Sequence, residues 1–205
     1  TIEGSKFSSS RNWAVWLPDY LARYDPDPLR YLLSINMPET GDTDFSWREF
    51  VRRNNDELVA TYGNLVHRVL TFVYRSFNGC VPTARGMGLE DNEEINKAPP
   101  TPLDIDAHAI LTNMDEELAK CHFRSALHQA MTLARKANRF LEETSPWKVI
   151  KEDRPAAARS LYQALKIVTQ LKTMLYPFLP FSSQKLHQYL GFEGNIEIYG
   201  WQWQE

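Results

Sequence analysis

Apolar side chains recur every three or four residues through three long segments of the chain, 46–79, 103–144 and 154–177. This spacing puts them on one face of an α-helix, which turns once every 3.6 residues. The alternation of apolar and polar residues that is typical of strands occurs only near the end, in 196–203. We therefore expect a mainly α protein, a helical bundle with a small mixed α/β extension at its N-terminus.

The ends of these helices carry recognisable signals. Ser46 followed by Glu49 predicts a capping box, in which the hydroxyl accepts an early backbone N–H and the carboxylate reaches back to the cap. Gly79 suits the left-handed position after a helix end. Gly63 lies inside the same segment, where it costs about 1 kcal/mol relative to Ala. It therefore marks a kink or permits close packing.

Later in the chain the apolar stripe changes phase near Cys121, which predicts two helices within 103–144. Arg154-Pro155 begins another helix, and Ser182 and Ser183 are expected to cap a final short one that ends at Gly191. The tail 196–203 is expected to be a strand or an extended segment. Residues 79–103 contain four prolines and three glycines and are typical of a long surface loop.

The N-terminal part differs from the rest. Asp25-Pro26 predicts the start of a short helix that ends near Asn36. The following segment 39–44 is polar and turn-forming. We place a domain boundary there, with residues 1–44 as the extension and 45–205 as the helical domain.

Composition excludes several classes of protein. The net charge is −3, so any nucleic-acid contact must be local rather than a matter of bulk electrostatics. The longest apolar run, around 171–181, is broken by Lys172, Pro177 and Pro180, so no membrane helix is expected. The start of the chain does not resemble a signal peptide and is typical of an excised fragment. Cys80 and Cys121 fit neither a disulfide framework nor a zinc site, which favours a reducing cytoplasm.

A lysine beside three hydroxyl residues, in the segment Lys6-Phe7-Ser8-Ser9-Ser10, can neutralise a phosphate, although such a loop is more often simply polar. This segment resembles the Lys-Met-Ser-Lys-Ser signature of class I aminoacyl-tRNA synthetases. Residues 3–13 resemble the form of that signature in methionyl enzymes of the archaeal type. Residues 27–31 are similar to the segment that follows the loop in that family.

Two further segments resemble the anticodon-reading parts of the methionyl enzymes: Asn64-Leu65-Val66-His67-Arg68, and Pro146-Trp147. The resemblance implies a helical anticodon-binding domain of the class Ia type that recognises a CAU anticodon on a methionine tRNA. Asn64, Arg68 and Trp147 would make the contacts, with Trp147 stacking on the first base. For these residues to act together, Trp147 must be partly exposed and lie at the same end of the bundle as Asn64 and Arg68.

The resemblance also implies that the full enzyme is a methionine–tRNA ligase using ATP and Mg²⁺. Lys6 would be its catalytic residue, and Lys6, Ser8 and Ser10 would contact ATP. The second signature lysine is Ser9 here, and the His-x-Gly-His signature is absent. We therefore expect this chain to bind no ATP and to be inactive without the catalytic domain. Two alternatives remain open: the same domain of a leucyl, valyl or cysteinyl enzyme, and a helical interaction module with no role in RNA binding.

Overall fold

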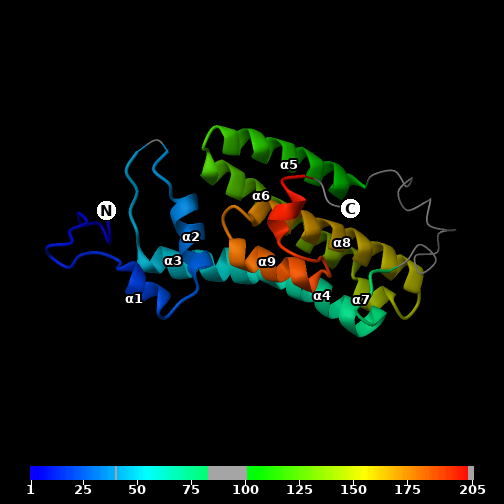
Figure 1. The fold of residues 1–205 in the computed structure, drawn as a ribbon. Coiled ribbons are helices and arrows are strands. Elements are labelled where there is room, and N and C mark those ends of the chain that lie inside the picture. Colours follow the sequence, from blue (N-terminus) through cyan, green and yellow to red (C-terminus); the bar gives the residue numbers. More distant parts are fainter. Residues whose placement is uncertain (40, 83–100, 203–205) are drawn as a thin grey trace.

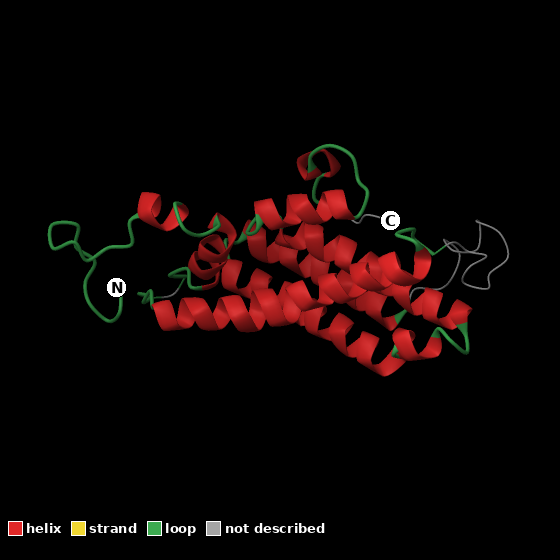
Figure 2. Ribbon diagram, turned by 90° about the horizontal axis from the view of Figure 1, so that it is seen from below, coloured by secondary structure: helices red, strands yellow, loops and turns green. Residues whose placement is uncertain are grey.

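The computed structural model describes residues 1–39, 41–82 and 101–202, which form an elongated helical molecule (Figure 1). The predicted mainly α fold is confirmed, and Figure 2 shows helices and loops but no strand in these ranges. Pairing of the β type is limited there to isolated bridges, which join Ile2 to Ser5 and Phe45, and Ser8 to Trp13. The predicted loop 79–103 lies mostly outside the described residues.

The N-terminal extension contains α1 (Leu17–Leu21) and α2 (Pro26–Ile35). Its first residues are fastened to the segment just before the long helix, since the N-terminal ammonium of Thr1 donates to the carbonyl of Thr43 at 2.9 Å. The α2 helix begins after Asp25 and ends before Asn36, as predicted.

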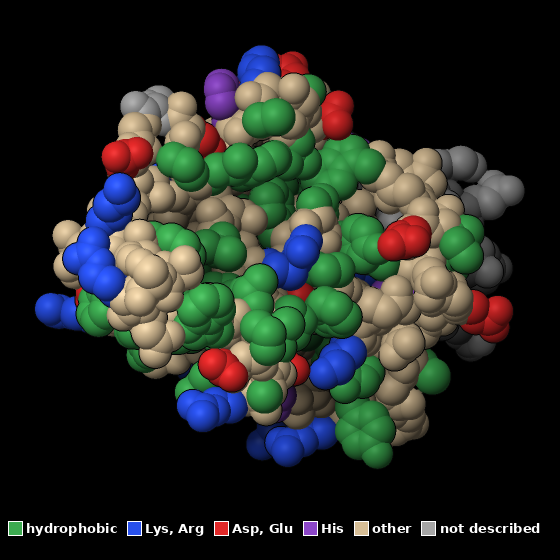
Figure 3. Space-filling model, turned by 60° about the vertical axis from the view of Figure 1, so that its left-hand side comes forward, with side chains coloured by type: hydrophobic (Ala, Val, Ile, Leu, Met, Phe, Trp, Pro, Cys, Tyr) green, Lys and Arg blue, Asp and Glu red, His purple; other side chains and the backbone are tan. Residues whose placement is uncertain are grey.

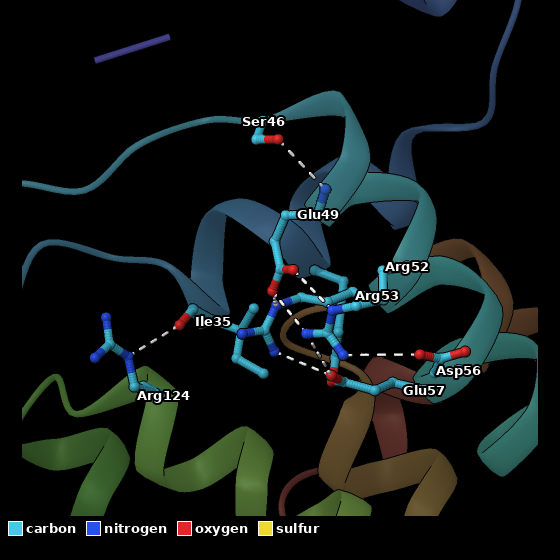
Figure 4. Close-up of polar contacts among 9 residues, drawn as sticks. Ile35, Ser46, Glu49, Arg52, Arg53, Asp56, Glu57 and Arg124 are labelled. Atoms are coloured by element: carbon cyan, nitrogen blue, oxygen red, sulfur yellow. Dashed lines mark hydrogen bonds and ion pairs between the residues drawn. The ribbon is translucent and has the colours of Figure 1, made fainter. Parts of the chain in front are cut away.

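One continuous helical path follows, made of α3 (Trp47–Arg53), the π-helix η1 (Asn54–Gly63) and α4 (Asn64–Phe77). The path begins as predicted at Ser46, whose Oγ accepts from the backbone N–H of Glu49 at 3.5 Å. The predicted second bond of the capping box, from the backbone N–H of Ser46 to the Glu49 carboxylate, is wrong. The carboxylate instead binds Arg52 and Arg53 at 2.7 Å each (Figure 4). Charge-assisted bonds of this kind are stronger than a bond to a neutral N–H. The hydrogen bond from Arg52 lowers the pKa of Glu49 to about 2.

A hydrogen bond holds α2 against this long helix, and an ion pair within the long helix orients the acceptor of that bond. Arg53 also reaches Glu57 at 3.0 Å, and the Tyr31 hydroxyl from α2 donates to the Glu57 carboxylate. From a later helix, α6 (Phe123–Thr144), the Arg124 Nε donates to the carbonyl of Ile35 at 3.1 Å (Figure 4). The extension is therefore joined by specific bonds to the helices that follow it.

Gly63 ends the π-helical segment, and the structure explains why a glycine stands there. A Cβ added at Gly63 would lie 2.9 Å from the carbonyl oxygen of Leu58, five residues earlier on the same helix. In a π-helix the backbone N–H bonds to the carbonyl five residues back, so these two residues approach closely. Of the two alternatives, close packing is confirmed, and the packing partner is the helix's own backbone.

We expect Gly63→Ala to lower the free energy of unfolding by roughly 1–3 kcal/mol, the usual cost of forcing atoms into filled space. The backbone of Leu58 would have to shift, and this outweighs the gain of about 1 kcal/mol in helix propensity. Gly41→Ala is the control, because a Cβ there meets nothing within 4 Å. Urea unfolding of both variants checks this; a stabilised Gly63→Ala protein would contradict it.

The remaining helices complete the bundle: α5 (Pro102–Ala119), α6 (Phe123–Thr144), α7 (Pro146–Val149), α8 (Arg154–Leu175) and α9 (Pro180–Tyr189). The junction predicted near Cys121 is confirmed, and Cys121 adopts a left-handed conformation there, with φ of 59°. Fifteen of the residues of α8 are buried, so this helix is the centre of the core. Complete burial of an aliphatic side chain contributes about 1.5–3 kcal/mol, which makes α8 the main packing element.

Two predictions near the C-terminus were wrong. Ser182 and Ser183 lie inside the first turn of α9 rather than before it, so neither is its N-cap. Asp27 of α2 caps the helix instead, because its Oδ2 accepts from the backbone N–H of Ser182 at 2.6 Å. The tail forms a 3₁₀ turn, η3 (Ile196–Tyr199), instead of a strand. In the part of the chain that the structure describes, no helix has the length and apolar character to cross a bilayer.

Candidate functional site

A tight turn after α6 exposes a tryptophan. Ser145 takes a left-handed conformation, with φ of 40°, and ends α6; Pro146 then starts the short helix α7. The N–H of Lys148 closes the turn on the carbonyl of Ser145 at 2.8 Å. Pro146 is buried and Trp147 keeps 38% of its surface exposed. The turn thus packs the proline inward and leaves part of the tryptophan exposed.

Arg68 of α4 lies over this indole. Its Cζ is 4.8 Å from the centroid of the Trp147 ring, a distance typical of a cation–π contact. The two residues are far apart in the sequence, and only the packing of α4 beside α7 joins them. The expectation that Trp147 is partly exposed and at the same end of the bundle as Arg68 is confirmed. Figure 1 shows α7 at the end of the molecule away from the N-terminal extension.

Two residues of α6 complete the surroundings of Arg68, and neither was predicted. The Arg68 Nη1 donates to Asn138 Oδ1 at 3.4 Å and lies 3.8 Å from Glu142 Oε1. Their spacing of four residues, on one face of α6, is the sole hint in the sequence. That hint is weak, because many exposed pairs have this spacing.

Asn64 is exposed and begins α4, four residues before Arg68. Residues with this spacing share a helix face, so the Asn64 amide and the Arg68 guanidinium project to the same side. The backbone N–H of Asn64 donates to the carbonyls of Val59 and Thr61, the last turn of the π-helix. The start of α4 is therefore set by how the π-helix ends.

An open indole, a guanidinium and a primary amide form a combination suited to single-stranded nucleic acid. The indole can stack on a base, the amide can bond to a base edge, and the guanidinium can bond to a phosphate or a base. This surface is small, which agrees with a chain whose net charge is −3. Groups of this kind can bind RNA, and none of them is a nucleophile or a general base.

The second predicted site, Lys6, Ser8 and Ser10, lies in the N-terminal extension. Backbone hydrogen bonds of 3.0 and 2.8 Å between Ser8 and Trp13 close the loop, and the Oγ atoms of Ser8 and Ser10 are 3.2 Å apart. Lys6 is exposed and lines a hollow together with Arg11, so two positive charges border the same space. That charge fits a phosphate group.

The structure does not bring the two predicted sites together. The loop at Lys6 belongs to the N-terminal end of the molecule, and α7 lies at the opposite end (Figure 1). Among the described residues, no three His, Cys, Asp or Glu side chains gather in a group that could hold a metal ion.

Comparison with known families divides the chain into two matches. Residues 1–70 match a family model described as tRNA synthetases class I (M), and residues 96–202 match the anticodon binding domain of methionyl tRNA ligase. The methionine–tRNA ligase of Dehalococcoides mccartyi is 55% identical over 201 residues, which are 98% of this chain and 35% of that protein. The corresponding ligase of Chloroflexus aurantiacus is 50% identical over 196 residues, which are 96% of this chain and 31% of that protein.

A solved structure has the same fold. Mycobacterium tuberculosis methionyl-tRNA synthetase in complex with methionyl-adenylate superposes with a TM-score of 0.79 at 23% identity, over 94% of this chain and 37% of that one. The chain spans about a third of the length of the two methionine–tRNA ligases it matches.

Proposed function

Because this chain belongs to the methionyl-tRNA synthetase family, we propose that the surface formed by Asn64, Arg68 and Trp147 binds the anticodon loop of a methionine tRNA and reads the sequence CAU. The observation that carries this proposal is the contact between Arg68 and the partly exposed Trp147. It joins two segments that the sequence keeps apart, at the end of the bundle away from the N-terminal extension.

Each side chain has a distinct role in the proposal. Trp147 stacks on the first anticodon base, which contributes roughly 1–3 kcal/mol. Asn64 donates to and accepts from a base edge, since an amide offers both kinds of group. Arg68 binds the backbone beside the stacked base, and its position over the indole directs the guanidinium toward that place.

In the whole protein we propose that this domain serves a ligase that joins methionine to its tRNA with ATP and Mg²⁺ in the cytoplasm. Residues 1–44 form the end of its catalytic domain, where Lys6, Ser8 and Ser10 contact the ATP phosphates, and residues 45–205 form the anticodon-binding domain. Support comes from the two positive charges at the loop and from its distance from α7 (Figure 1). One RNA bound at both places would extend along the molecule.

The catalytic domain of the same protein is the proposed partner of the exposed hydrophobic side chains near the N-terminus. Figure 3 shows hydrophobic groups gathered on the side of the molecule that carries the extension. The large hydrophobic side chains that are exposed on the extension and α3 are Phe7, Trp13, Trp16, Leu17, Leu21, Tyr24, Leu33, Met37, Trp47 and Val51. An uncovered apolar surface of this kind marks an interface.

The two alternatives fare less well. An interaction module without a role in RNA binding predicts a buried Trp147, separate from Arg68, whereas this indole is exposed and in contact with the guanidinium. The matches do not support a leucyl, valyl or cysteinyl enzyme, because they are to methionyl proteins.

Arg68→Ala tests the electrostatic part of the proposal in the full-length enzyme. We expect weaker binding to cognate and unrelated tRNA alike, because a backbone contact is independent of sequence. The dependence of log Kobs on log salt should flatten by about one counterion. Filter binding at several salt concentrations measures both effects.

Arg52→Ala is the matched control, because Arg52 is an exposed arginine on the same helical path but in α3. It should leave tRNA binding and the salt slope unchanged. An Arg68→Ala enzyme with the slope of the unaltered enzyme would show that Arg68 makes no phosphate contact.

A further inference from the structure

Beyond the three residues of the anticodon surface, the hydrogen bonds of Asn138 on α6 connect to two of them. We propose that Asn138 is a positioning residue that holds Arg68 and the start of α4, and thereby Asn64, in the arrangement that binds the anticodon. This inference rests on the proposed function of the Arg68–Trp147 surface. Asn138 itself is half-buried, and in this proposal it does not touch the RNA.

The orientation of the Asn138 amide follows from its partners. Its Nδ2 donates to the carbonyl of Thr61 at 2.9 Å and to the carbonyl of Ala134 at 3.1 Å. Carbonyl oxygens only accept, so the amide nitrogen must face them, and Oδ1 is left for a donor. That donor is Nη1 of Arg68, at 3.4 Å. The two backbone bonds fix the amide, and the amide in turn fixes one side of the guanidinium.

The link to Asn64 passes through the same carbonyl. The oxygen of Thr61 accepts from the Asn138 amide and from the backbone N–H of Asn64. It lies in the last turn of the π-helix, a form that is rare and frequently found at functional sites. A side-chain donor from α6 at this point holds the turn from which α4 begins.

Asn138 is the fixed neighbour of Arg68, in contrast to Glu142. The Glu142 carboxylate is 3.8 Å from the guanidinium, and its side chain is largely exposed. An exposed ion pair of this length holds a side chain only weakly. Without Asn138, Arg68 keeps its charge and the indole beneath it but loses its rigid hydrogen-bond acceptor. The predicted defect therefore concerns the binding of RNA more than the fold.

The test uses Asn138→Leu, which keeps the approximate shape, and Asn138→Ala, both in the full-length enzyme. We expect the Kd for a tRNA with a CAU anticodon to rise about tenfold, the effect of losing one or two net hydrogen bonds. Methionine-dependent exchange of pyrophosphate into ATP should stay within about twofold. Asn113→Leu, at an exposed asparagine of α5, is the matched control and should leave the Kd unchanged.

A double-mutant cycle separates positioning from a structural defect. In an Arg68→Ala background, Asn138→Leu should raise the Kd by about threefold or less, because its main partner is already gone. The same tenfold loss in both backgrounds, or no loss in the enzyme with Arg68, would overturn the positioning role. If Arg68→Ala and Trp147→Ala themselves leave the Kd unchanged, the proposed anticodon surface fails, and the inference fails with it. Loss in those two variants with none in Asn138→Leu refutes the inference alone.

Discussion

Replacing Lys6 by Ala in the full-length enzyme should slow formation of methionyl-adenylate by about 10²- to 10³-fold, the usual effect of removing one preorganised group that stabilises charge in a transition state. Lys6 is exposed on its loop, so its ammonium is available to the phosphates of ATP. The position of the second signature lysine is Ser9, which brings no charge of its own. Pyrophosphate exchange measures the rate directly.

The same Lys6→Ala enzyme should bind tRNA with unchanged affinity for the anticodon, because the loop lies at the end of the molecule away from α7 (Figure 1). Lys120→Ala, at an exposed lysine of the bundle, serves as the control and should leave both measurements unaltered. An exchange rate within about threefold of the unaltered enzyme would remove Lys6 from the proposed catalytic role.

Replacing Trp147 by Ala should cost roughly 1–3 kcal/mol in binding a tRNA with a CAU anticodon, which is the contribution of stacking on one base. At 1.4 kcal/mol per factor of ten, this corresponds to about 5- to 150-fold in Kd. Weak binding to an unrelated tRNA should barely change, because it contains no base placed against the indole. Filter binding with the full-length enzyme at one fixed salt concentration compares the two.

Trp147→Phe is the matched variant, because it keeps an aromatic face for the base. It should lose less affinity than Trp147→Ala. The fold should survive both changes, since the buried residue of this turn is Pro146 and the indole is partly exposed. Equal losses for cognate and unrelated tRNA, with unaltered unfolding, would mean that the tryptophan supports the domain without reading a base.

The helices could be predicted from the sequence because their signals are local. Apolar spacing and Asp25-Pro26 identify segments whose residues lie within a few turns of one another. The failures involve distant partners. The cap of α9 is the carboxylate of Asp27, which is 155 residues from Ser182, so no local sequence pattern predicts it. Likewise, Gln184 Oε1 accepts from the N–H of Ile196 at 2.9 Å, and the tail follows that contact instead of forming a strand.

The candidate site also has residues that could be predicted from the sequence and residues that could not. The resemblance of two segments to the methionyl enzymes named Asn64, Arg68 and Trp147 as a group, and the structure brings Arg68 and Trp147 into contact. Asn138 could not be named, because its proposed role comes from two bonds that it makes across the packing of α6 against the long helix, to Arg68 and to the carbonyl of Thr61. The π-helix that sets the start of α4 also escaped prediction, apart from the glycine that ends it.

Transfer of the CAU anticodon to an unrelated tRNA tests whether the surface at Trp147 reads the anticodon. The Kd of the full-length enzyme is measured for an unrelated tRNA before and after its anticodon is changed to CAU, with the unaltered enzyme and with Trp147→Ala. We expect CAU to improve the affinity of the unaltered enzyme by about tenfold or more, and that of Trp147→Ala much less. No improvement with the unaltered enzyme, or the same improvement with both, would contradict a reading surface at Trp147.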